Sequence, residues 1–534
     1  MIDDSMVSMQ HKPKNATRDL TSYFTYIAYM LYTKGMQNIG TRIAAVREQA
    51  GITQSKLAKL INTTQSAIAR IESGSQNVSS DMIKKISKAL NRNLLTPTPG
   101  SMNIQIEGGH KLKGTIETNT SKNGAVGLLC ASLLNRGKTT LKHMPKIEEV
   151  YRLIEVLQSI GVKVEWNDSD VTITPPKKFD LKHIDVEAAR KTRSIVMFIG
   201  PLIHHMQKFS LPQSGGCKLG SRTVRPHFYA LENFGVAIET TNDAFKVSVQ
   251  LKCPGEIILY ESGDTVTENA LFAAALAPCT TVIKYASANY MVQEICTFLR
   301  ACGVKIEGVG TTTLTVKGVA TINTDITYTL AEDPTDSMFF IATAIVTNSS
   351  LKITRCPIEF LELELLKLQK MNFQFSLSKP YFSYNGVTKL VDITTRPSKL
   401  VSLHEKIYAR PYPGLNIDNL PFFAVIATVA EGQTLIHDWV YEKRAIYFTE
   451  LDKLGAETML ADPHRIYITG PTKLRANELI CPPALRPATI LLIAMLGAEG
   501  RSVLRNIYSI NRGYENLVER LSGLGASISY LEEF

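Results

Sequence analysis

The stretch "VLQSIGVKVE" (156–165) runs from a helical pattern into a strand pattern through a single glycine. Apolar residues before Gly161 recur at helical spacing, and "VKVE" after it alternates apolar and charged side chains, as strands do. Helices commonly end on a residue with a left-handed backbone, which glycine adopts without a steric penalty. The stretch therefore predicts an α-helix, a glycine cap and a β-strand in direct succession.

The same pattern recurs five more times along the chain. The further copies are "LENFGVAIE" (231–239), "FLRACGVKIE" (298–307), "LQKMNFQFS" (368–376), "LDKLGAETML" (451–460) and "LSGLGASISY" (521–530). The six cap residues are Gly161, Gly235, Gly303, Asn372, Gly455 and Gly525, spaced 74, 68, 69, 83 and 70 residues apart. A regular period of this length indicates repeated supersecondary units. Six α/β units predict two lobes of three, with a ligand cleft between the lobes.

The composition of the 534-residue chain is that of an ordinary globular protein, with 44% hydrophobic and 20% charged residues. At about 150 residues per domain, the length predicts two to four domains. Residues 1–100 carry 13 Lys and Arg against 6 Asp and Glu, so +7 of the net charge of +10 lies in the first fifth. A basic end on a near-neutral body indicates a polyanionic partner for that end alone.

The eight cysteines include no C-x-x-C pair, and no signal peptide opens the chain. We therefore expect reduced thiols, no metal site and a cytoplasmic location. The most hydrophobic runs, such as "ATILLIAMLGA" (488–498), are too short to cross a bilayer, so no membrane partner is expected.

Changes in pattern divide the chain into four segments. Residues 1–36 form an N-terminal extension to which we assign no function, and residues 37–95 contain the helical run "TQSKLAKLINTTQSAIARIESG". The stretch "TPTPGS" (96–101), with two prolines and a glycine, is typical of a linker. The repeated units then occupy residues 102–534.

The helical run predicts two short helices joined by a tight turn. Thr53 and Thr64 are suited to cap the N-termini of the two helices, and Asn62 lies in the turn, where a left-handed residue is needed. Leu57 and Leu60 are expected to face the core. Helix, tight turn, helix is the geometry that delivers a recognition helix into the major groove of DNA.

This segment resembles the Cro/phage-repressor-like helix-turn-helix family. The resemblance implies a duplex DNA partner, with a phosphate contact from Gln54 and base-edge contacts from Gln65, Ser66 and Arg70. Gln pairs with adenine and Arg with guanine through two hydrogen bonds each. Modules of this kind bind as dimers, so self-association is expected. A helical protein-docking module is the alternative that the residues leave open.

A second motif, "QSGGCKLGSR" (213–222), places Cys217 among three glycines and two cations. The glycines predict a loop, and Lys218 and Arg222 would stabilise a thiolate, the reactive form of cysteine. The alternative is that Cys217 is an unreactive cysteine that packs in the core as a small apolar residue.

With "SKNGAVGLLC" (121–130) after the first strand and this cysteine loop in the second unit, the six units resemble the enolpyruvyl transferase family. The branch acting on UDP-N-acetylglucosamine matches better than the shikimate branch, which lacks the cysteine loop. The resemblance implies an α/β fold, a two-lobed inside-out α/β barrel, preceded here by a small all-α domain. Lobe one would span about 122–318, and lobe two 102–121 plus 319–534.

The resemblance also implies a reaction, which moves the enolpyruvyl group of phosphoenolpyruvate onto the 3-hydroxyl of UDP-N-acetylglucosamine with release of phosphate. No cofactor is needed. Cys217 would deliver a proton to the methylene carbon and form a covalent adduct, and Asp333, or Glu332 by a one-residue shift, would take the hydroxyl proton. Lys122, with Arg222 and Arg444, would clamp the anionic substrate. Further substrate-binding positions are Asn123, Arg193, His227, Asp418 and Arg486.

Four positions depart from the pattern of the family, mainly in the implied nucleotide pocket. They are Gly263-Asp264-Thr265, Arg225, Met291 in "ANYM" (288–291), and Asn511. Three interpretations follow: a transferase acting on UDP-N-acetylglucosamine, the same chemistry on a changed acceptor, or a DNA-binding regulator whose transferase domain senses a ligand without turnover. The joint presence of the predicted acid, clamp and base favours an enzyme, whereas the helix-turn-helix favours a regulatory role.

Overall fold

The computed structural model describes residues 102–213 and 223–531, and in the N-terminal part residues 52–73 with 40, 43, 44, 47, 82, 85, 86, 89 and 90. The predicted extension 1–36, Cys217 and Arg222 lie outside these described residues. The chain divides into two compact units, Met1–Thr96 and Pro97–Phe534. The division falls at the first residue of the stretch expected to be a linker.

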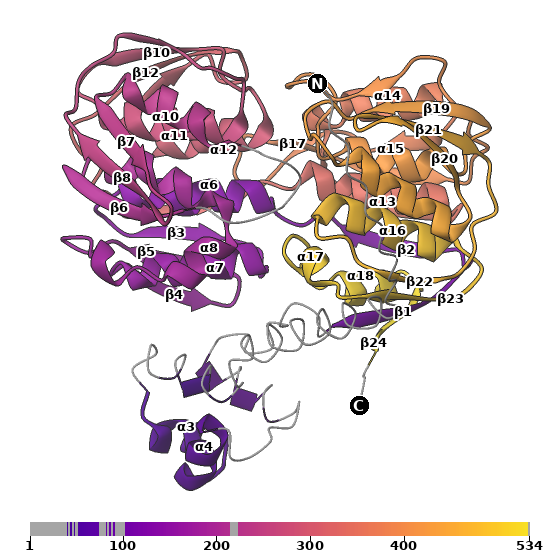
Figure 1. Cartoon of the computed structure of the whole chain (residues 1–534), viewed down its shortest axis with the longest axis horizontal. Coiled ribbons are helices and arrows are strands. Elements are labelled where there is room, and N and C mark those ends of the chain that lie inside the picture. Colours follow the sequence, from indigo (N-terminus) through magenta and orange to yellow (C-terminus); the bar gives the residue numbers. More distant parts are fainter. Residues whose placement is uncertain are drawn as a thin grey trace, which may run out of the picture. The chain divides into compact units, whose positions relative to one another are not determined.

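Lobe one of the larger unit carries three small sheets on its outside (Figure 1). Its strands are β3 (Thr139–Lys142), β4 (Lys163–Asn167), β5 (Asp170–Thr174), β6 (Lys208–Pro212), β7 (Val236–Thr240), β8 (Ala244–Val249), β9 (Glu256–Ile258), β10 (Thr280–Lys284), β11 (Lys305–Glu307), β12 (Thr313–Lys317) and β13 (Ile326–Thr329). The strand orders are β13-β3-β5-β4, β6-β8-β7 and β11-β12-β10-β9.

The helices of lobe one pack inside this ring of sheets. They are α6 (Lys122–Ala131), α7 (Glu148–Ser159), α8 (Val186–Lys191), α9 (Ile199–Leu202), α10 (Arg225–Glu232), α11 (Asp264–Ala275) and α12 (Tyr290–Ala301), with 3₁₀ turns η1 (Ser132–Leu134), η2 (Leu181–His183) and η3 (Arg193–Phe198). Helices α6, α11 and α12 contact one another in the centre, so burial of apolar side chains holds the sheets around the helices.

Lobe two repeats this arrangement with its own core. Its strands are β1 (Asn103–Gly108), β2 (Lys113–Glu117), β14 (Ser350–Pro357), β15 (Gln374–Leu377), β16 (Tyr381–Phe382), β17 (Lys389–Arg396), β18 (Ile407–Tyr408), β19 (Gly432–His437), β20 (Glu457–Asp462), β21 (Arg465–Gly470), β22 (Glu478–Ile480), β23 (Gly500–Arg505) and β24 (Ser527–Leu531). The strand orders are β22-β23-β1-β24, β15-β17-β14-β2 and β18-β19-β21-β20, with β16 beside β17.

The central helices of lobe two are strongly apolar. They are α13 (Pro334–Val346), α15 (Leu420–Ala427) and α16 (Leu485–Gly497), which contact one another; the remaining helices are α14 (Glu362–Lys370), α17 (Tyr508–Asn511) and α18 (Leu517–Gly523), with η4 (Ile358–Phe360) and η5 (Ala445–Leu454). Nearly all side chains of the three central helices are buried. The α/β two-lobed fold with helices inside is thus confirmed.

All six predicted caps have the left-handed backbone that the repeat requires. Their φ angles lie between 69° and 94°, from Asn372 at 69° to Gly161 and Gly303 at 94°. Each cap follows one of α7, α10, α12, α14, η5 and α18 and precedes a strand. The repeat read from the sequence is therefore the structural repeat.

Two expectations differ from the structure. Strand β13 pairs in parallel with β3, with Ile326 opposite Thr139, so lobe one extends to Thr329 and not to about residue 318. Cys253 and Cys279, expected to be reduced, form a disulfide with their Cα atoms 6.0 Å apart. They meet because each cysteine lies three residues before a register pair of the parallel strands β9 and β10.

The N-terminal unit contains helices α3 (Gln54–Leu60) and α4 (Gln65–Glu72). The side chains of Thr53 and Thr64 accept hydrogen bonds from backbone N–H groups of the first turns, and Asn62 has a φ of 54°, as predicted. Leu60, however, is 54% exposed, because the short helix turns Ala58 and Ile61 to the core instead. None of the described helices has the length and apolar character needed to span a bilayer.

Candidate active site

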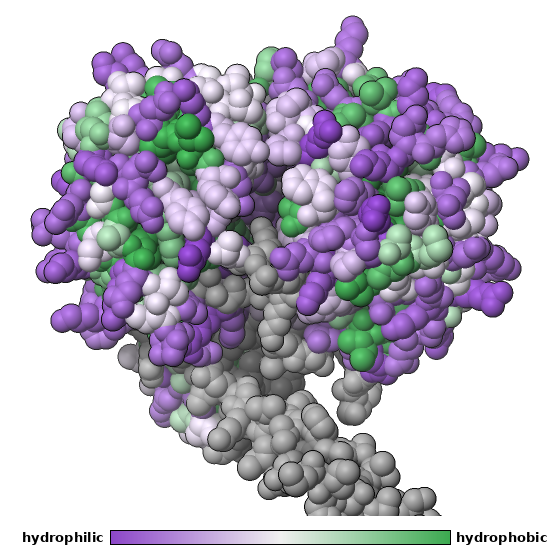
Figure 2. Space-filling model, turned by 45° about the horizontal axis from the view of Figure 1, so that its top comes forward, coloured by the Kyte–Doolittle hydropathy of each residue, from purple (hydrophilic) through white to green (hydrophobic). Residues whose placement is uncertain are grey.

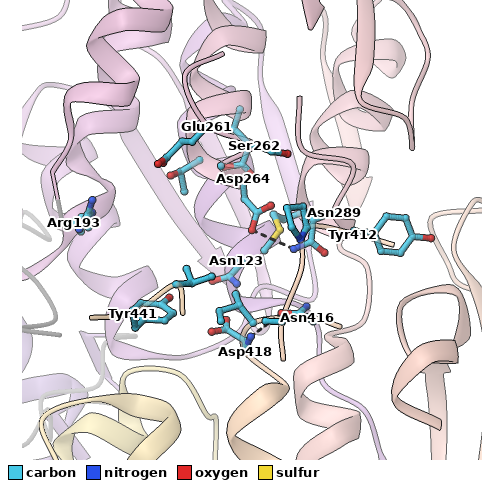
Figure 3. Close-up of a pocket in the computed structure, with 18 of the residues that line it drawn as sticks. Asn123, Arg193, Glu261, Ser262, Asp264, Asn289, Tyr412, Asn416, Asp418 and Tyr441 are labelled. Atoms are coloured by element: carbon cyan, nitrogen blue, oxygen red, sulfur yellow. Dashed lines mark hydrogen bonds between the residues drawn. The ribbon is translucent and has the colours of Figure 1, made fainter. Parts of the chain in front are cut away.

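A cavity of about 630 Å³ lies between the two lobes. Lobe one contributes the start of α6, the start of η3 and residues 260–265, and lobe two contributes residues 409–418 and 439–444. The hollow between the lobes is visible in Figure 2, and Figure 3 shows side chains from both lobes turned into it. The cleft predicted from the six units is therefore present and is built by loops at the ends of strands and helices.

One wall of the cavity is cationic and is centred on a buried carboxylate, Glu149. The Lys122 Nζ atom lies 3.9 Å from Oε2 of Glu149, to which Nη2 of Arg512 donates a hydrogen bond of 2.7 Å. Thr192 Oγ1 donates to Oε1 of Glu149 at 2.5 Å. Burial acts to raise the pKa of Glu149, but Lys122 and Arg512 outweigh it and hold this pKa at about 2.

The buried position of Lys122 makes the charged form of its side chain less favourable. Burial lowers the pKa of its ammonium group, while the Glu149 carboxylate opposes that effect. Glu149 belongs to lobe one and Arg512 to lobe two, so the carboxylate both supports the lysine and connects the lobes. Neither Glu149 nor Arg512 was predicted, because no local pattern distinguishes them from surface charges.

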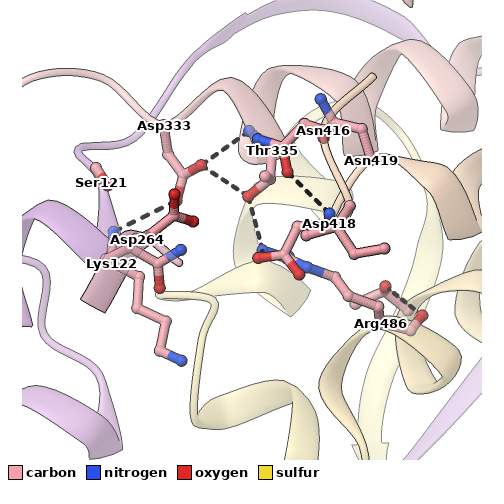
Figure 4. A network of polar contacts seen from close by, with 12 residues as sticks. Ser121, Lys122, Asp264, Asp333, Thr335, Asn416, Asp418, Asn419 and Arg486 are labelled. Atoms are coloured by element: carbon pink, nitrogen blue, oxygen red, sulfur yellow. Dashed lines mark hydrogen bonds and ion pairs between the residues drawn. The ribbon is translucent and has the colours of Figure 1, made fainter. Parts of the chain in front are cut away.

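A second group of charges surrounds Arg486 of α16 (Figure 4). The guanidinium donates to the hydroxyls of Tyr514 at 2.7 Å and Thr335 at 2.8 Å, and lies 3.4 Å from Oδ2 of Asp418. Burial acts to raise the pKa of Asp418, but the positive charges of Arg486, Arg444 and Lys122 outweigh it and lower this pKa. The carboxylate is therefore ionised. Asp418, Arg444 and Arg486, three of the residues predicted to bind substrate, all line the cavity.

Arg444 is held from several sides although it reaches the cavity wall. Its Nε donates to Oδ2 of Asp438 at 2.5 Å, and Nη2 donates to the carbonyl of Ile417 at 2.8 Å. The guanidinium lies 4.2 Å from the ring centroid of Tyr441. Because Asp438 neutralises much of its charge, Arg444 is better placed to shape the wall than to carry the whole clamp.

Asp333 is buried next to the cavity but is not among the residues that line it. It caps α13, accepting from the N–H and hydroxyl of Thr335 at 2.8 and 2.7 Å, and Oδ2 accepts from the backbone N–H of Lys122 at 3.3 Å (Figure 4). Burial raises the pKa of Asp333, an effect that Arg486 reduces. The alternative, Glu332, instead pairs with Arg355.

Three further predicted residues line the cavity: Asn123, Arg193 and His227. The Nη2 atom of Arg193 donates to the carbonyl of Thr223 at 2.8 Å, at the residue where the described chain resumes after position 222. His227 is buried, with Nε2 3.3 Å from Oγ1 of Thr265. The structure thus brings together seven of the ten predicted substrate and catalytic residues.

The departures from the family pattern fall partly on the cavity wall. Gly263, Asp264, Thr265 and Met291 line the cavity, whereas Arg225 and Asn511 are not among its lining residues. Asp264 opens α11, and its two carboxylate oxygens accept from Ser287 Oγ at 2.6 Å and Asn289 Nδ2 at 3.2 Å (Figure 3). This part of the wall therefore carries a fixed negative charge. Across the described ranges, no three His, Cys, Asp or Glu side chains gather as a metal ion would require.

The predicted DNA-contacting residues lie along α3 and α4 of the N-terminal unit. Gln65 donates through its side-chain amide to Gln54 at 2.8 Å, and Gln54 donates to Glu72 at 2.8 Å. Glu72 is buried and ion-paired with Arg47. The Gln54 and Gln65 side chains are thus oriented by a continuous chain of contacts, and Gln65, Ser66 and Arg70 are exposed.

Comparison with known proteins decides the family. The profile of the EPSP synthase (3-phosphoshikimate 1-carboxyvinyltransferase) family matches residues 106–521. The chain belongs to the enolpyruvyl transferase family. A helix-turn-helix profile matches residues 43–95, so this enolpyruvyl transferase carries the second module that the sequence predicts.

Curated relatives place the enolpyruvyl transferase more closely. It is 35% identical over 432 residues to the UDP-N-acetylglucosamine 1-carboxyvinyltransferase of Treponema denticola, covering 80% of this chain and 99% of that protein. It is 31% identical over 435 residues to the protein of that name from Bradyrhizobium diazoefficiens, covering 80% and 98%. Both matches confirm the predicted resemblance.

Solved structures support the fold of the transferase. The enolpyruvyl transferase NikO from Streptomyces tendae aligns with a TM-score of 0.71 at 23% identity, covering 82% of this chain and all of that chain. EPSP synthase from Acinetobacter baumannii aligns with a TM-score of 0.64 at 18% identity, covering 81% and 100%.

Proposed function

We propose that this enolpyruvyl transferase moves the enolpyruvyl group of phosphoenolpyruvate to the 3-hydroxyl of UDP-N-acetylglucosamine, releasing phosphate. The observation that carries the proposal is the set of cations converging on one cavity, with Lys122, Arg486 and Arg512 on its wall. Phosphoenolpyruvate is a compact, multiply charged anion, which such a set binds well. The acceptor is carried over from the names of the curated relatives.

The proposed reaction balances in two steps. In the first, the acceptor oxygen bonds to C2 of phosphoenolpyruvate, the hydroxyl proton leaves to a base, and C3 gains a proton to become a methyl group. In the second, the bond from C2 to the phosphate oxygen breaks, phosphate leaves, and C3 returns a proton. The products are an enolpyruvyl ether and inorganic phosphate, and no cofactor takes part.

Roles within this scheme follow from the family resemblance and the site. Cys217 is proposed as the proton donor to C3, and Arg222 as a phosphate clamp, on the resemblance alone. Asp333 is proposed as the base, supported by its contact with the backbone of Lys122. Asp418 is the second candidate base, because its ionised carboxylate lines the cavity.

Phosphate release from phosphoenolpyruvate and UDP-N-acetylglucosamine tests the proposal. Replacing a positioned acid or base typically costs ~10²–10⁴-fold in rate, so Cys217→Ala should lose that much. Asp333→Asn and Asp418→Asn identify the base. The variant that lacks the base should lose as much kcat as Cys217→Ala, while the other variant should mainly raise KM. Glu155→Gln, on α7 and away from the cavity, is the matched control. Absence of phosphate release with every UDP-amino sugar would refute the enzyme and favour the ligand-sensing regulator.

The N-terminal unit supports a second function, the reading of duplex DNA by a homodimer. Exposed Gln65, Ser66 and Arg70 on α4 are suited to base edges, and the excess of +7 in the first 100 residues favours a polyanion. A protein that binds DNA must be in the compartment that holds the DNA. The proposal therefore includes a cytoplasmic location. Selection from random duplexes should enrich a palindrome whose preference relaxes in Arg70→Ala. Recovery of no sequence would leave a protein-docking role.

A further inference from the structure

Three exposed aromatic side chains border the cavity at its mouth. Tyr260 and Tyr285 of lobe one are 73% and 53% exposed, and Trp439 of lobe two is 48% exposed. Large apolar rings in contact with water at the edge of a cavity point to a ligand that covers them. None of these residues takes part in the contacts that hold the cationic wall.

Strand pairing explains why the two tyrosines lie together. Strands β9 and β10 are parallel, with Ile258 opposite Lys284, and the N–H of Leu259 donates to the carbonyl of Lys284 at 3.1 Å. Tyr260 and Tyr285 therefore leave the sheet side by side at its carboxyl edge. The ring of Tyr229 lies behind Tyr260, with ring centroids 5.4 Å apart, and supports one side of this platform.

The backbone of Tyr285 carries an independent sign of function. Its φ angle is +59°, in the left-handed region that bulky side chains rarely adopt. Such strain persists only where the surroundings fix it, and it gathers at ligand sites. Here the next residue, Ala286, is tied by its N–H to the carbonyl of Thr312 at 3.0 Å, which keeps the Tyr285 ring at the cavity mouth.

Trp439 is held on the other side of the mouth. Its indole N–H donates to the carbonyl of Ala409 at 2.7 Å, which fixes the plane of the ring while about half of it remains exposed. Beside the tyrosines, the carboxylate of Glu261 lines the cavity and has no hydrogen-bond or ion-pair partner among the residues that the structure describes. The mouth thus offers flat apolar rings on both lobes and one free acceptor.

We propose that Tyr260, Tyr285 and Trp439 bind the planar base of a nucleotide-linked acceptor by stacking, and that Glu261 accepts a hydrogen bond from an N–H on the edge of that base. The inference rests on the proposed function, in which the acceptor carries a uracil, whose N3–H is such a donor. Stacking on an aromatic side chain holds a base strongly, because every base presents a flat π-face. It makes these residues determinants of acceptor specificity, separate from the cationic wall.

Fluorescence of Trp439 reads the proposed contact directly. The chain has two tryptophans, so in full-length Trp166→Phe only Trp439 emits. UMP should quench this emission saturably, and ribose 5-phosphate, which lacks the base, should not. On that background, Tyr260→Ala and Tyr285→Ala should each raise the half-saturating UMP concentration roughly tenfold. Tyr530→Ala, a partly exposed tyrosine outside the cavity, is the control and should change nothing.

Kinetics and a modified base separate the possible outcomes. Both tyrosine variants should raise KM for UDP-N-acetylglucosamine and leave kcat and KM for phosphoenolpyruvate unchanged. N3-methyl-UMP, which lacks the N3–H donor, should bind the Trp166→Phe protein as weakly as UMP binds the same protein with Glu261→Ala. UMP quenching without phosphate release would sustain this subsite and refute the proposed acceptor. Phosphate release with unchanged KM in both tyrosine variants, or no quenching by UMP, would overturn the subsite.

Discussion

Replacing Glu149 with Gln tests whether the buried carboxylate sustains the charge of Lys122. The substitution keeps a carbonyl that accepts from Thr192 but removes the negative charge 3.9 Å from the lysine Nζ. At an effective dielectric constant near 20, two unit charges about 4 Å apart interact by roughly 4 kcal/mol. The lysine side chain is 20% exposed, and the retained amide dipole recovers part of the loss, leaving about 1–2 kcal/mol.

This loss should appear as weaker binding of phosphoenolpyruvate. Since about 1.4 kcal/mol is a factor of ten in the protonation equilibrium of Lys122, KM for phosphoenolpyruvate should rise by up to about tenfold at pH values where the variant lysine has lost its proton and the wild-type lysine has not. Burial already lowers the pKa of Lys122, and removing Glu149 lowers it further, so less of the lysine is cationic as the pH rises. The ratio of the variant KM to the wild-type KM should therefore be larger at pH 9 than at pH 7.

Steady-state phosphate release at both pH values measures this ratio. Glu155→Gln is the control, because Glu155 lies on the same helix and pairs with Arg152 at 2.6 Å, away from the cavity. A ratio that stays constant between pH 7 and pH 9 would show that Glu149 does not act through the lysine charge. An unchanged KM in Glu149→Gln would remove the carboxylate from substrate binding altogether.

Three further predictions concern stability. Burial raises the pKa of Glu294 to about 8, above its ordinary value of 4.5, so between these pH values the folded state keeps a proton that the unfolded state has lost. The stability of the wild type therefore falls as the pH rises from 5 to 8, whereas glutamine does not titrate. The melting temperature of Glu294→Gln minus that of the wild type should thus increase from pH 5 to pH 8. Arg47→Ala leaves Glu72 buried without its cationic partner, although the hydrogen bond from Gln54 remains, and removing one partner of a buried ion pair typically costs ~3–5 kcal/mol, so proteolysis should attack the N-terminal unit while phosphate release persists. Asn372→Ala should lower the midpoint of denaturant unfolding further than Asn372→Gly does, because both variants lose the amide's hydrogen bond to the Lys399 carbonyl but only glycine adopts the φ of 69° without strain.

The local features of the fold could be predicted because each rests on neighbouring residues. A left-handed cap between a helix and a strand needs glycine or asparagine, so the six units were visible in the sequence, and Thr53 and Thr64 marked their helices in the same way. The cationic residues of the site followed from motifs that the family resemblance supplied.

Contacts between distant segments left no such trace. The pairing of β13 with β3 joins residues almost two hundred positions apart, and nothing near Ile326 announces it. The disulfide of Cys253 with Cys279 depends on the register of two strands, and the contact of Glu149 with Arg512 depends on how the lobes meet. The aromatic mouth of the cavity was missed for the same reason, because Trp439 and Tyr260 belong to different lobes.

The interleaving of the lobes sets an order of events during synthesis. Strand β1 follows the linker, yet its two neighbours in the sheet, β23 and β24, come last in chain order among the strands that the structure describes. The N-terminal unit and lobe one are complete while β1 still waits for both partners, and Arg486 and Arg512 lie in the final tenth of the chain. A message cut short before that point would yield a helix-turn-helix unit attached to an incomplete transferase domain.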